Sequence, residues 1–113
     1  MNNNVLSEIF KALSDENRII ILKLLSAKEM NAGQILSKLN ITQPTLSHHM
    51  KILCDCELIT SRKNGKWTLY SVNEKIISSV SSILMDIAKN EDSVGQIKFS
   101  IEASKSDLPS HLL

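Results

Sequence analysis

The sequence predicts a mainly α-helical domain that carries one small β-hairpin. Apolar residues recur at helical spacing over long stretches, which only three glycines and two prolines interrupt in 113 residues. One Asn-Gly pair, Asn64-Gly65, lies between two segments rich in β-branched and aromatic residues, a pattern typical of a tight hairpin. A chain of this length forms one compact domain at most, and its core needs neither disulfides nor a metal for support.

Two helices are expected near the start of the chain. Positions 5, 6, 9, 10 and 13 are apolar and share one face of a short first helix. Ser14 or Asp15 can cap a second helix, which is expected to run from Glu16 to about Ala27. The second helix is too apolar for a surface helix, so we expect it to lie in the core.

A short third helix and a longer fourth helix are expected next. Asn31 is a good N-cap for the third helix, whose apolar positions 35, 36 and 39 are expected to face inward. Thr42 can cap the fourth helix, and Pro44 suits its first turn because first-turn amides have no helical partner. This helix is expected to run to about Cys56. Its predicted buried face consists of Leu46, Met50 and Leu53.

The hairpin is expected to pair residues 58–63 with residues 66–72. Asn64 and Gly65 are expected to supply the positive φ angles that a tight hairpin turn needs. Trp67 is expected to cover the core at the base of the hairpin. This segment is the strongest local signal in the chain.

A last helix is expected from Asn73 to about Asn90, followed by a segment with a weaker pattern. The helix has more apolar surface than a terminal helix on so small a body needs, so it is a candidate dimer face. Residues 97–103 alternate between apolar and polar side chains as a strand does, and residues 104–113 resemble a loose tail. We therefore assign the folded domain to residues 1–90 and a C-terminal extension to residues 91–113.

The order of these elements, with a polar-tipped fourth helix before a basic hairpin, is typical of a helix-turn-helix that presents its second helix to DNA. The major groove accepts one helix, and its base edges are read by polar side chains of the kind found near the start of the fourth helix. The basic hairpin tip suits phosphate or the minor groove. Because the formal net charge is only +1, the charge that favours DNA is local. The predicted DNA-binding residues are Gln43, Thr45, Ser47, His48, Lys51, Arg62, Lys63 and Lys66.

Several of the polar residues also have a structural interpretation. His49 lies next to Met50, which favours a buried structural histidine over a base reader. Arg18 either forms a local salt bridge or contacts phosphate, and the sequence favours neither. Lys63 and Lys66 can be solvated turn residues, although their position after a helix-turn-helix pattern favours DNA contact. A module that binds only other proteins is disfavoured by the basic hairpin and the polar start of the fourth helix.

Membrane insertion, secretion and catalysis are not expected. The longest apolar runs, such as residues 19–22, fall far short of the roughly 18 residues that span a bilayer. Residues 1–4 have neither the basic start nor the apolar stretch of a secretory signal, so we predict a cytosolic protein with reduced thiols. The candidate thiol nucleophiles Cys54 and Cys56 share one short segment with His48 and His49, and no third group is evident to orient them. The sequence thus predicts a binding protein and not an enzyme.

Three segments of the chain resemble the ArsR/SmtB family of bacterial winged-helix repressors. They are residues 13–22, residues 43–53 with the pattern Gln-Pro-x-x-Ser-x-His, and residues 62–70 with the pattern Arg-Lys-x-Gly-Lys-Trp. The resemblance covers about residues 5–90 and implies a winged helix-turn-helix fold. It also implies a homodimer that packs its first and last helices across a two-fold axis, binds a palindromic duplex operator and is released by an inducer. The dimer-interface residues that it implies are Leu6, Ile9, Val80, Ile83, Leu84 and Ile87.

Many members of this family sense metals, but the sequence departs from their best-known sites. The arsenic-type site has a Cys-x-Cys pair near the start of the third helix, and residues 29–40 of this chain contain no cysteine. The zinc-type site needs paired Asp and His on the last helix, and residues 73–90 contain no histidine. Cys54 and Cys56 lie instead at the end of the fourth helix, where some cadmium- and lead-sensing relatives keep a ligand.

The thiols of Cys54 and Cys56 leave three interpretations open. Soft thiolates suit zinc, cadmium, lead or trivalent arsenic. Side chains at i and i+2 of a helix point to nearly opposite faces, however, so chelation would require fraying of the helix and a third ligand such as His111. A thiol redox switch would require exposure and a lowered thiol pKa. Simple packing of both cysteines is favoured and no cofactor is expected, with a metal-sensing or redox-sensing repressor as the alternative.

Overall fold

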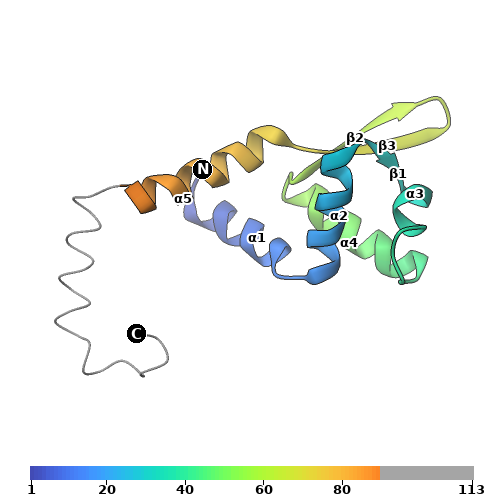
Figure 1. Cartoon of the computed structure of the whole chain (residues 1–113), viewed down its shortest axis with the longest axis horizontal. Helices are drawn as coiled ribbons and strands as arrows, with labels where there is room; N and C mark the ends of the chain where they lie inside the picture. The colour runs from blue at the N-terminus through green and yellow to red at the C-terminus, as the bar shows by residue number, and fades with distance from the viewer. Residues whose placement is uncertain (90–113) are drawn as a thin grey trace, which may run out of the picture. The chain divides into compact units, whose positions relative to one another are not determined.

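The structure is a computed structural model that describes residues 1–89 as five helices and three strands (Figure 1). In chain order these are α1 (Asn3–Leu13), α2 (Glu16–Ala27), β1 (Met30–Asn31), α3 (Ala32–Leu36), α4 (Gln43–Asp55), β2 (Ile59–Asn64), β3 (Trp67–Val72) and α5 (Glu74–Lys89). The prediction of a mainly helical fold with one β-hairpin is confirmed. The strand predicted for residues 97–103 and the tail predicted for residues 104–113 lie outside the described residues.

The chain divides into two units, Met1–Ser78 and Ser79–Leu113. The first unit contains every element from α1 to β3 together with the beginning of α5. The described part of the second unit is the remainder of α5, which ends at Lys89. All of the predicted DNA-binding residues therefore belong to the first unit.

Three of the helices begin where the sequence predicts a cap. The side chain of Asp15 caps α2. Asn31 and Gln34 form a reciprocal capping box at the start of α3, because each side-chain oxygen accepts a hydrogen bond from the other residue's amide, at 2.8 and 2.9 Å. Thr42 Oγ1 accepts a hydrogen bond from the Thr45 amide at the start of α4. These caps fix where α2, α3 and α4 begin.

The end of α4 is closed by a Schellman motif, which places a non-glycine residue in the left-handed region. The Leu58 amide donates to the Leu53 carbonyl, and the Glu57 amide donates to the Cys54 carbonyl, both at 3.0 Å. Glu57 has a φ of 62°. Leu53 and Leu58 are both fully buried, as the hydrophobic contact of this motif requires. The chain therefore turns sharply from α4 into β2.

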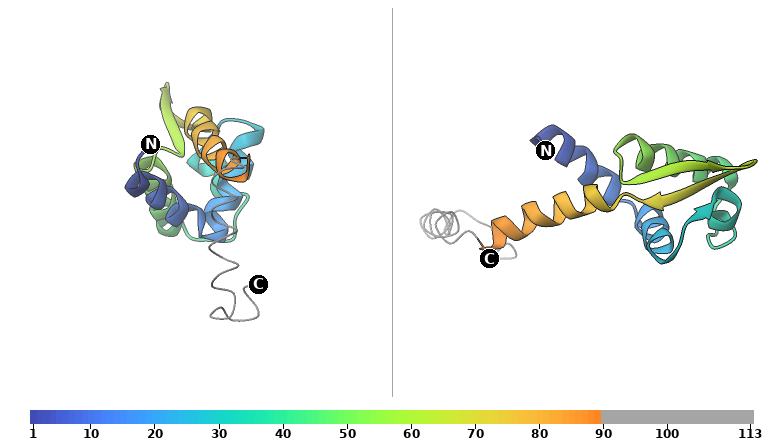
Figure 2. Two further views of the ribbon diagram at one scale, coloured as in Figure 1. Left: turned by 90° about the vertical axis from the view of Figure 1, so that its left-hand side faces the viewer. Right: turned by 90° about the horizontal axis from the view of Figure 1, so that it is seen from above.

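The three strands form an antiparallel sheet in the order β1-β3-β2. β1 pairs Met30 with Tyr70, and β2 pairs with β3 along its whole length. The sequence pattern does not predict β1, because a strand of two residues is too short to show a periodicity. We call residues 59–72, the β2–β3 hairpin, the wing. Figures 1 and 2 show the wing extending beyond the helices of the first unit.

The turn of the wing differs from the predicted one. Asn64 pairs with Trp67, so the two loop residues are Gly65 and Lys66 and not Asn64 and Gly65. Among the loop residues only Gly65 has a positive φ, of 62°. A positive φ at the first loop position alone fits a type II′ turn, so Asn64 does not supply a positive φ angle as expected. The register thus shifts the loop by one residue toward the C-terminus.

The core of the first unit lies where α2 meets α1, α4 and β3. Its buried apolar residues are Ile9, Ala12, Ile21, Leu25, Met30, Ile35, Leu46, Met50, Leu53, Leu58 and Ile59. The predicted buried face of α4 is therefore confirmed. The prediction for α2 holds in part, because Ile21 and Leu25 are buried but Ile19 is exposed.

Candidate nucleic-acid interface

Helix α4 presents its predicted DNA-binding side chains on the exposed side. All five of them are exposed, while the face opposite them is buried in the core. Their spacing arranges them in two rows along the helix. One row contains Gln43, Ser47 and Lys51, at i, i+4 and i+8, and the other contains Thr45 and His48. A helix with one anchored and one polar exposed face is the arrangement that groove reading requires.

A part-buried contact joins α2 to α4. The Arg18 Nη1 lies 3.1 Å from His49 Nδ1, and the Arg18 Nε donates to the Ala12 carbonyl at 2.7 Å. Because a guanidinium only donates, His49 Nδ1 is the acceptor in this contact. His49 is only 6% exposed, which confirms its interpretation as a structural histidine. Arg18 thus forms hydrogen bonds within the chain, whereas the two alternatives left open by the sequence were a local salt bridge and a phosphate contact.

Asp15 lies at the edge of this contact. Its Oδ1 accepts a hydrogen bond from the Arg18 amide and lies 4.0 Å from His49 Nδ1. Desolvation acts to raise the pKa of Asp15, but the hydrogen bond from the Arg18 amide and the positive charge of Arg18 outweigh it and lower the pKa. Asp15 therefore remains ionised as the cap of α2 and faces the Arg18–His49 contact.

In the wing, Arg62 forms a bidentate ion pair within the chain. Its Nε and Nη2 donate to the two carboxylate oxygens of Glu29 at 2.8 and 2.7 Å. The hydrogen bonds and charge of Arg62 lower the pKa of Glu29, and the same contact raises the pKa of Arg62. The sequence gives no signal of this pair, because the two residues are 33 positions apart. Arg62 must exchange Glu29 for phosphate if it contacts DNA.

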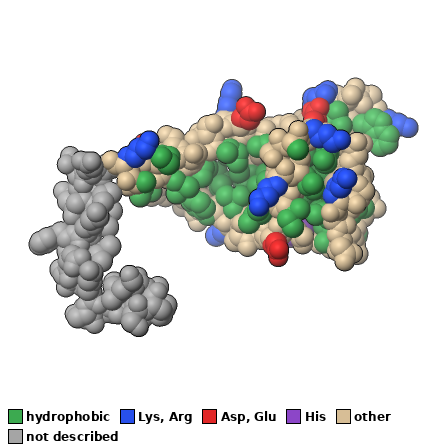
Figure 3. Space-filling view, viewed as in Figure 1, with side chains coloured by type: hydrophobic (Ala, Val, Ile, Leu, Met, Phe, Trp, Pro, Cys, Tyr) green, Lys and Arg blue, Asp and Glu red, His purple; other side chains and the backbone are tan. Residues whose placement is uncertain are grey.

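The other basic residues of the wing have weaker partners. Lys63 Nζ donates to Thr68 Oγ1 at 2.9 Å, and Lys66 Nζ lies 5.1 Å from the centre of the Trp67 ring. Trp67 is 52% exposed and pairs with the last residue of β2, so it lies at the tip of the wing and not at its base as predicted. Figure 3 shows Lys and Arg side chains gathered around the wing end of the first unit. The tip therefore presents cations beside an aromatic ring.

The residues implied as a dimer interface differ widely in exposure. Ile9 and Val80 are only 0% and 7% exposed in the single chain, so they have little surface left for a partner. Leu6 and Ile83 are partly exposed. Leu84 and Ile87 are exposed on α5. Further exposed apolar residues, which the interface prediction did not include, are Val5 and Phe10 on α1 and Ile77 and Met85 on α5.

The two cysteines line different hollows of the first unit. Cys54 faces a cavity beside Tyr70, whereas Cys56 lines a separate hollow with Glu8 and donates a weak hydrogen bond to the Leu53 carbonyl. Burial raises the pKa of both thiols, and Asp55 adds to the effect. Among residues 1–89 no group of three or more His, Cys, Asp or Glu side chains is placed to hold a metal ion. His111, named as a third ligand, lies outside the described residues.

No helix in the described part of the chain is both long and apolar enough to span a bilayer.

Residues 15–61 match the family model described as "Bacterial regulatory protein, arsR family". This segment runs from the cap of α2 to the first half of β2. It therefore includes the whole helix-turn-helix.

The chain is similar to named bacterial repressors over most of its length. It is 45% identical over 92 residues to an arsenical resistance operon repressor of Staphylococcus xylosus. The aligned region covers 81% of this chain and 88% of that protein. It is 36% identical over 88 residues to the transcriptional repressor SdpR of Bacillus subtilis, with 77% of this chain and 98% of the relative covered. The similarity thus extends over nearly the full length of SdpR.

Solved structures show the same fold at lower identity. An ArsR-like transcriptional regulator from Rhodococcus sp. RHA1 superposes with a TM-score of 0.72 over 95% of each chain at 24% identity. A homodimeric winged helix-turn-helix DNA-binding domain from Mycobacterium bovis superposes with a TM-score of 0.63 at 22% identity, over 79% of this chain and 82% of that one. These likenesses establish a winged helix-turn-helix, in which α3 and α4 form the motif and residues 59–72 the wing.

Proposed function

Because this chain belongs to the ArsR family of bacterial regulatory proteins, which regulate transcription and are not enzymes, we propose that it is a repressor that binds duplex DNA as a homodimer. The observation that carries the proposal is the exposed polar side of α4, whose opposite face is anchored in the core. In this proposal an inducer weakens the complex with DNA. The operator is palindromic, since a two-fold symmetric protein matches a two-fold symmetric site.

Each part of the first unit has its own role on DNA. α4 enters the major groove, where Thr45, Ser47 and His48 offer hydrogen-bonding groups to base edges. α3 crosses the backbone, as the first helix of such a motif does. In the wing, Arg62, Lys63 and Lys66 contact phosphates or the adjacent minor groove. Gln43 and Lys51, in the same row of α4 as Ser47, are proposed as further DNA contacts. We assign sequence reading to α4 and sequence-independent affinity to the wing.

The second copy is proposed to bind through α1 and α5. Both helices expose large apolar residues that a monomer leaves in water, including Phe10, Leu84 and Ile87, the last of which is 59% exposed. The dimer residues we retain from the sequence prediction are Leu6, Ile83, Leu84 and Ile87. Residues 1–90 then serve as the DNA-binding and dimerisation domain. Leu84→Glu should yield a monomer in sedimentation equilibrium, whereas Lys89→Glu, a polar change on the same helix, should leave the dimer intact.

The inducer of this chain is proposed not to be an arsenical, although the name of the staphylococcal relative refers to arsenical resistance. In this chain the start of α3 is occupied by the capping box of Asn31 and Gln34, and residues 29–40 offer no thiolate. The thiols of Cys54 and Cys56 face separate hollows and have raised pKa values, which disfavours joint chelation and fast oxidation. The metal-sensing and redox-sensing alternatives thus gain no support from the described residues.

Binding to duplex DNA tests the proposal. Fluorescence anisotropy should show tight, salt-dependent binding to duplex from the region upstream of the protein's own gene, and much weaker binding to a scrambled duplex. Replacing Ser47 and His48 together by Ala should reduce the preference for the operator by about tenfold or more, since each good base contact contributes about 1–3 kcal/mol of discrimination. Ser26→Ala, at an exposed site on α2, serves as the control.

Changes in the wing should act differently. Lys63→Ala should lower the affinity for operator and scrambled duplex alike and reduce the salt dependence, because a phosphate contact carries no sequence information. If the Ser47 and His48 double variant keeps the full preference for the operator, α4 does not read the sequence. If neither duplex binds with a salt-dependent affinity, the proposed function is wrong.

A further inference from the structure

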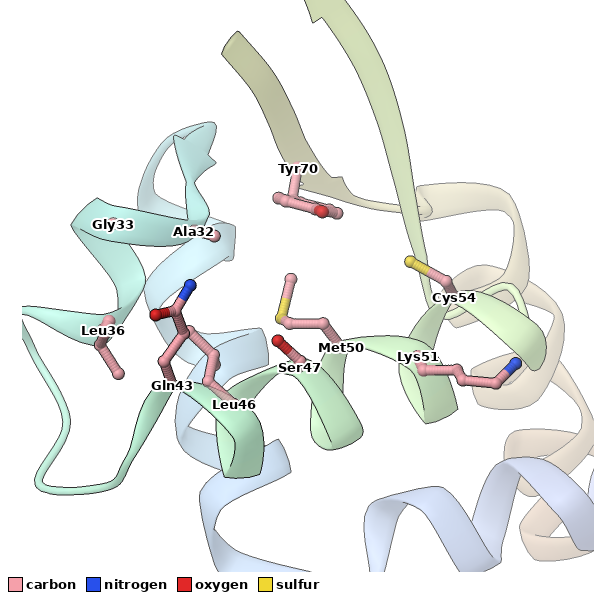
Figure 4. Close-up of a pocket in the computed structure, with 10 residues that line it drawn as sticks. All are labelled: Ala32, Gly33, Leu36, Gln43, Leu46, Ser47, Met50, Lys51, Cys54 and Tyr70. Atoms are coloured by element: carbon pink, nitrogen blue, oxygen red, sulfur yellow. The ribbon is translucent and has the colours of Figure 1, made fainter.

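The first unit contains a cavity of about 330 Å³ between α3, α4 and β3 that the proposed DNA contacts do not explain. Residues that line it are Ala32, Gln43, Ser47, Met50, Cys54 and Tyr70. Figure 4 shows the Tyr70 ring on one side and the Met50 side chain pointing toward it from α4. The Gln43 amide and the Cys54 thiol also point into this space. The cavity is therefore bordered by one sheet residue and two helices and opens to solvent on its remaining side.

The lining of the cavity fits a neutral, largely aromatic molecule. The thioether of Met50 packs well against aromatic edges, and the Tyr70 ring offers a second surface of the same kind. Burial raises the pKa of Cys54, so its thiol is neutral near pH 7. Lys51 is the one cation among the lining residues, and its Nζ is paired with Asp55 at 2.9 Å. An anion in the cavity would have to compete with Asp55 for this lysine.

Size and hydrogen bonding narrow the ligand further. An engineered cavity of about 150 Å³ binds benzene, and ligand sites in proteins begin at about 300 Å³. A cavity of about 330 Å³ therefore accommodates a molecule of two fused rings. Gln43 and Ser47 provide a donor and an acceptor at one side, which suits one hydroxyl or amino group on the ring system. Fused rings with a single polar substituent satisfy both requirements.

We propose that this cavity is the inducer site and that it takes a neutral bicyclic aromatic molecule with one polar substituent. The effect on DNA rests on the proposed function, whereas binding to the cavity does not. Gln43 and Ser47 line the cavity and are also assigned to DNA contact. These side chains cannot face a ligand and a base edge at the same time, so ligand and operator compete. Binding of the ligand thus releases the repressor.

The first test measures ligand binding to the full chain without DNA. Isothermal titration calorimetry with 1-naphthol should give a Kd of about 10–500 µM, as expected for a ligand of this size. The anionic analogue 1-naphthalenesulfonate should bind at least fivefold more weakly. Ala32→Leu, which fills the cavity from α3, should weaken binding of 1-naphthol at least tenfold. Ala27→Leu, the same change at an exposed alanine outside the cavity, should leave the Kd unchanged.

A second cavity-filling variant guards against misfolding. If circular dichroism shows that Ala32→Leu is unfolded, Cys54→Leu fills the same space from α4 and should weaken binding to a similar degree. Equal affinity of 1-naphthol for the wild type and a folded cavity-filling variant would place the ligand elsewhere and overturn the proposal. Absence of any binding by the wild type would do the same.

The second test measures competition with DNA. Saturating 1-naphthol should lower the affinity for operator duplex at least fivefold, and the folded cavity-filling variant should lose this response. Binding of 1-naphthol in the cavity without an effect on DNA affinity would overturn the assignment as inducer site. Loss of all DNA binding would contradict the proposed function instead, and the calorimetric result would still decide whether the cavity binds the ligand.

Discussion

Helix α4 and the wing both carry proposed DNA contacts, but they are fixed in the molecule in different ways. α4 buries Leu46, His49, Met50 and Leu53 and is capped at both ends. In the wing, every residue from position 60 to position 67 is exposed, and strand pairing together with the exposed Arg62–Glu29 ion pair holds it in place. A segment without buried side chains opens and moves more easily than one anchored in a core. Base reading needs fixed geometry, whereas phosphate contacts tolerate movement, so this difference fits the proposed division of tasks between the two regions.

The two regions also differ in charge. The exposed side of α4 carries mostly neutral polar groups, and its one lysine is paired with Asp55. The wing carries three cations, of which Arg62 is paired with Glu29 and Lys66 lies against Trp67. Exposed ion pairs contribute little to stability, so they can be exchanged for phosphate contacts. We therefore expect changes in α4 to affect folding and sequence preference, and changes in the wing to affect general affinity.

The largest expected effect concerns the anchoring of α4. Leu53→Ala should lower the free energy of unfolding by about 2–5 kcal/mol, because it removes a fully buried side chain and leaves a cavity. Trp67→Ala at the tip of the wing should change it by less than about 1 kcal/mol, since the ring is half exposed and buries little. Urea denaturation monitored by circular dichroism measures both. Similar losses for the two variants would contradict the comparison.

The next effect concerns the contact between α2 and α4. Arg18→Met should lower the free energy of unfolding by about 1–3 kcal/mol, because it leaves the buried His49 Nδ1 without its donor. Arg62→Met, the same change in the wing, should leave unfolding nearly unchanged and weaken DNA binding instead. Thermal unfolding of both variants measures the stability, and fluorescence anisotropy with duplex DNA measures the binding. A larger stability loss for the wing variant would show that the Glu29 pair anchors the fold.

A smaller effect concerns one backbone angle that occurs in both regions. Glu57 after α4 and Gly65 in the wing turn both have a φ of 62°. Because this angle costs a non-glycine residue about 1 kcal/mol, Glu57→Gly should stabilise the protein by about that amount. Gly65→Ala should destabilise it by a similar amount, even though its Cβ would meet no atom within 4 Å. Glu57→Ala, which keeps the left-handed strain, is the control in urea denaturation.

The smallest effect concerns the Glu29–Arg62 pair. Glu29→Gln should raise the affinity for operator and scrambled duplex alike by about twofold to fivefold, since it frees one cation for phosphate. The pair lowers the pKa of Glu29, so its contribution to stability is present at neutral pH and disappears as the pH falls through that lowered pKa. Any difference in melting temperature between wild type and Glu29→Gln should therefore shrink at acidic pH, as Glu29 becomes protonated. A difference that persists there would exclude the ion pair as its cause.

The sequence predicts those parts of the fold that depend on neighbouring residues. The caps at Asp15, Asn31 and Thr42 and the buried stripe of α4 are local patterns, and the structure confirms them. The short strand β1 has too few residues for a pattern. The hairpin register places Trp67 at the tip, because the partner of a strand residue depends on the turn and not on its own side chain.

The candidate site is less predictable than the fold for the same reason. The exposed residues of α4 follow from helical spacing alone. The contacts of charged residues around the candidate site join positions far apart in the sequence. Examples are Arg18 with His49 and Glu29 with Arg62. The cavity beside Tyr70 likewise depends on how three separate elements meet. Pairs and cavities of this kind cannot be predicted without the tertiary structure.

Asn31 belongs to two structures at once, since its backbone pairs with Leu69 in the sheet and its side chain caps α3. A displacement of the central strand β3 therefore reaches α3, the first helix of the helix-turn-helix, through Asn31 alone. Mechanical strain applied at the wing, as when DNA bends around it, would be transmitted directly to the segment that leads into α4. Asn31 thus joins the sheet directly to the helix-turn-helix.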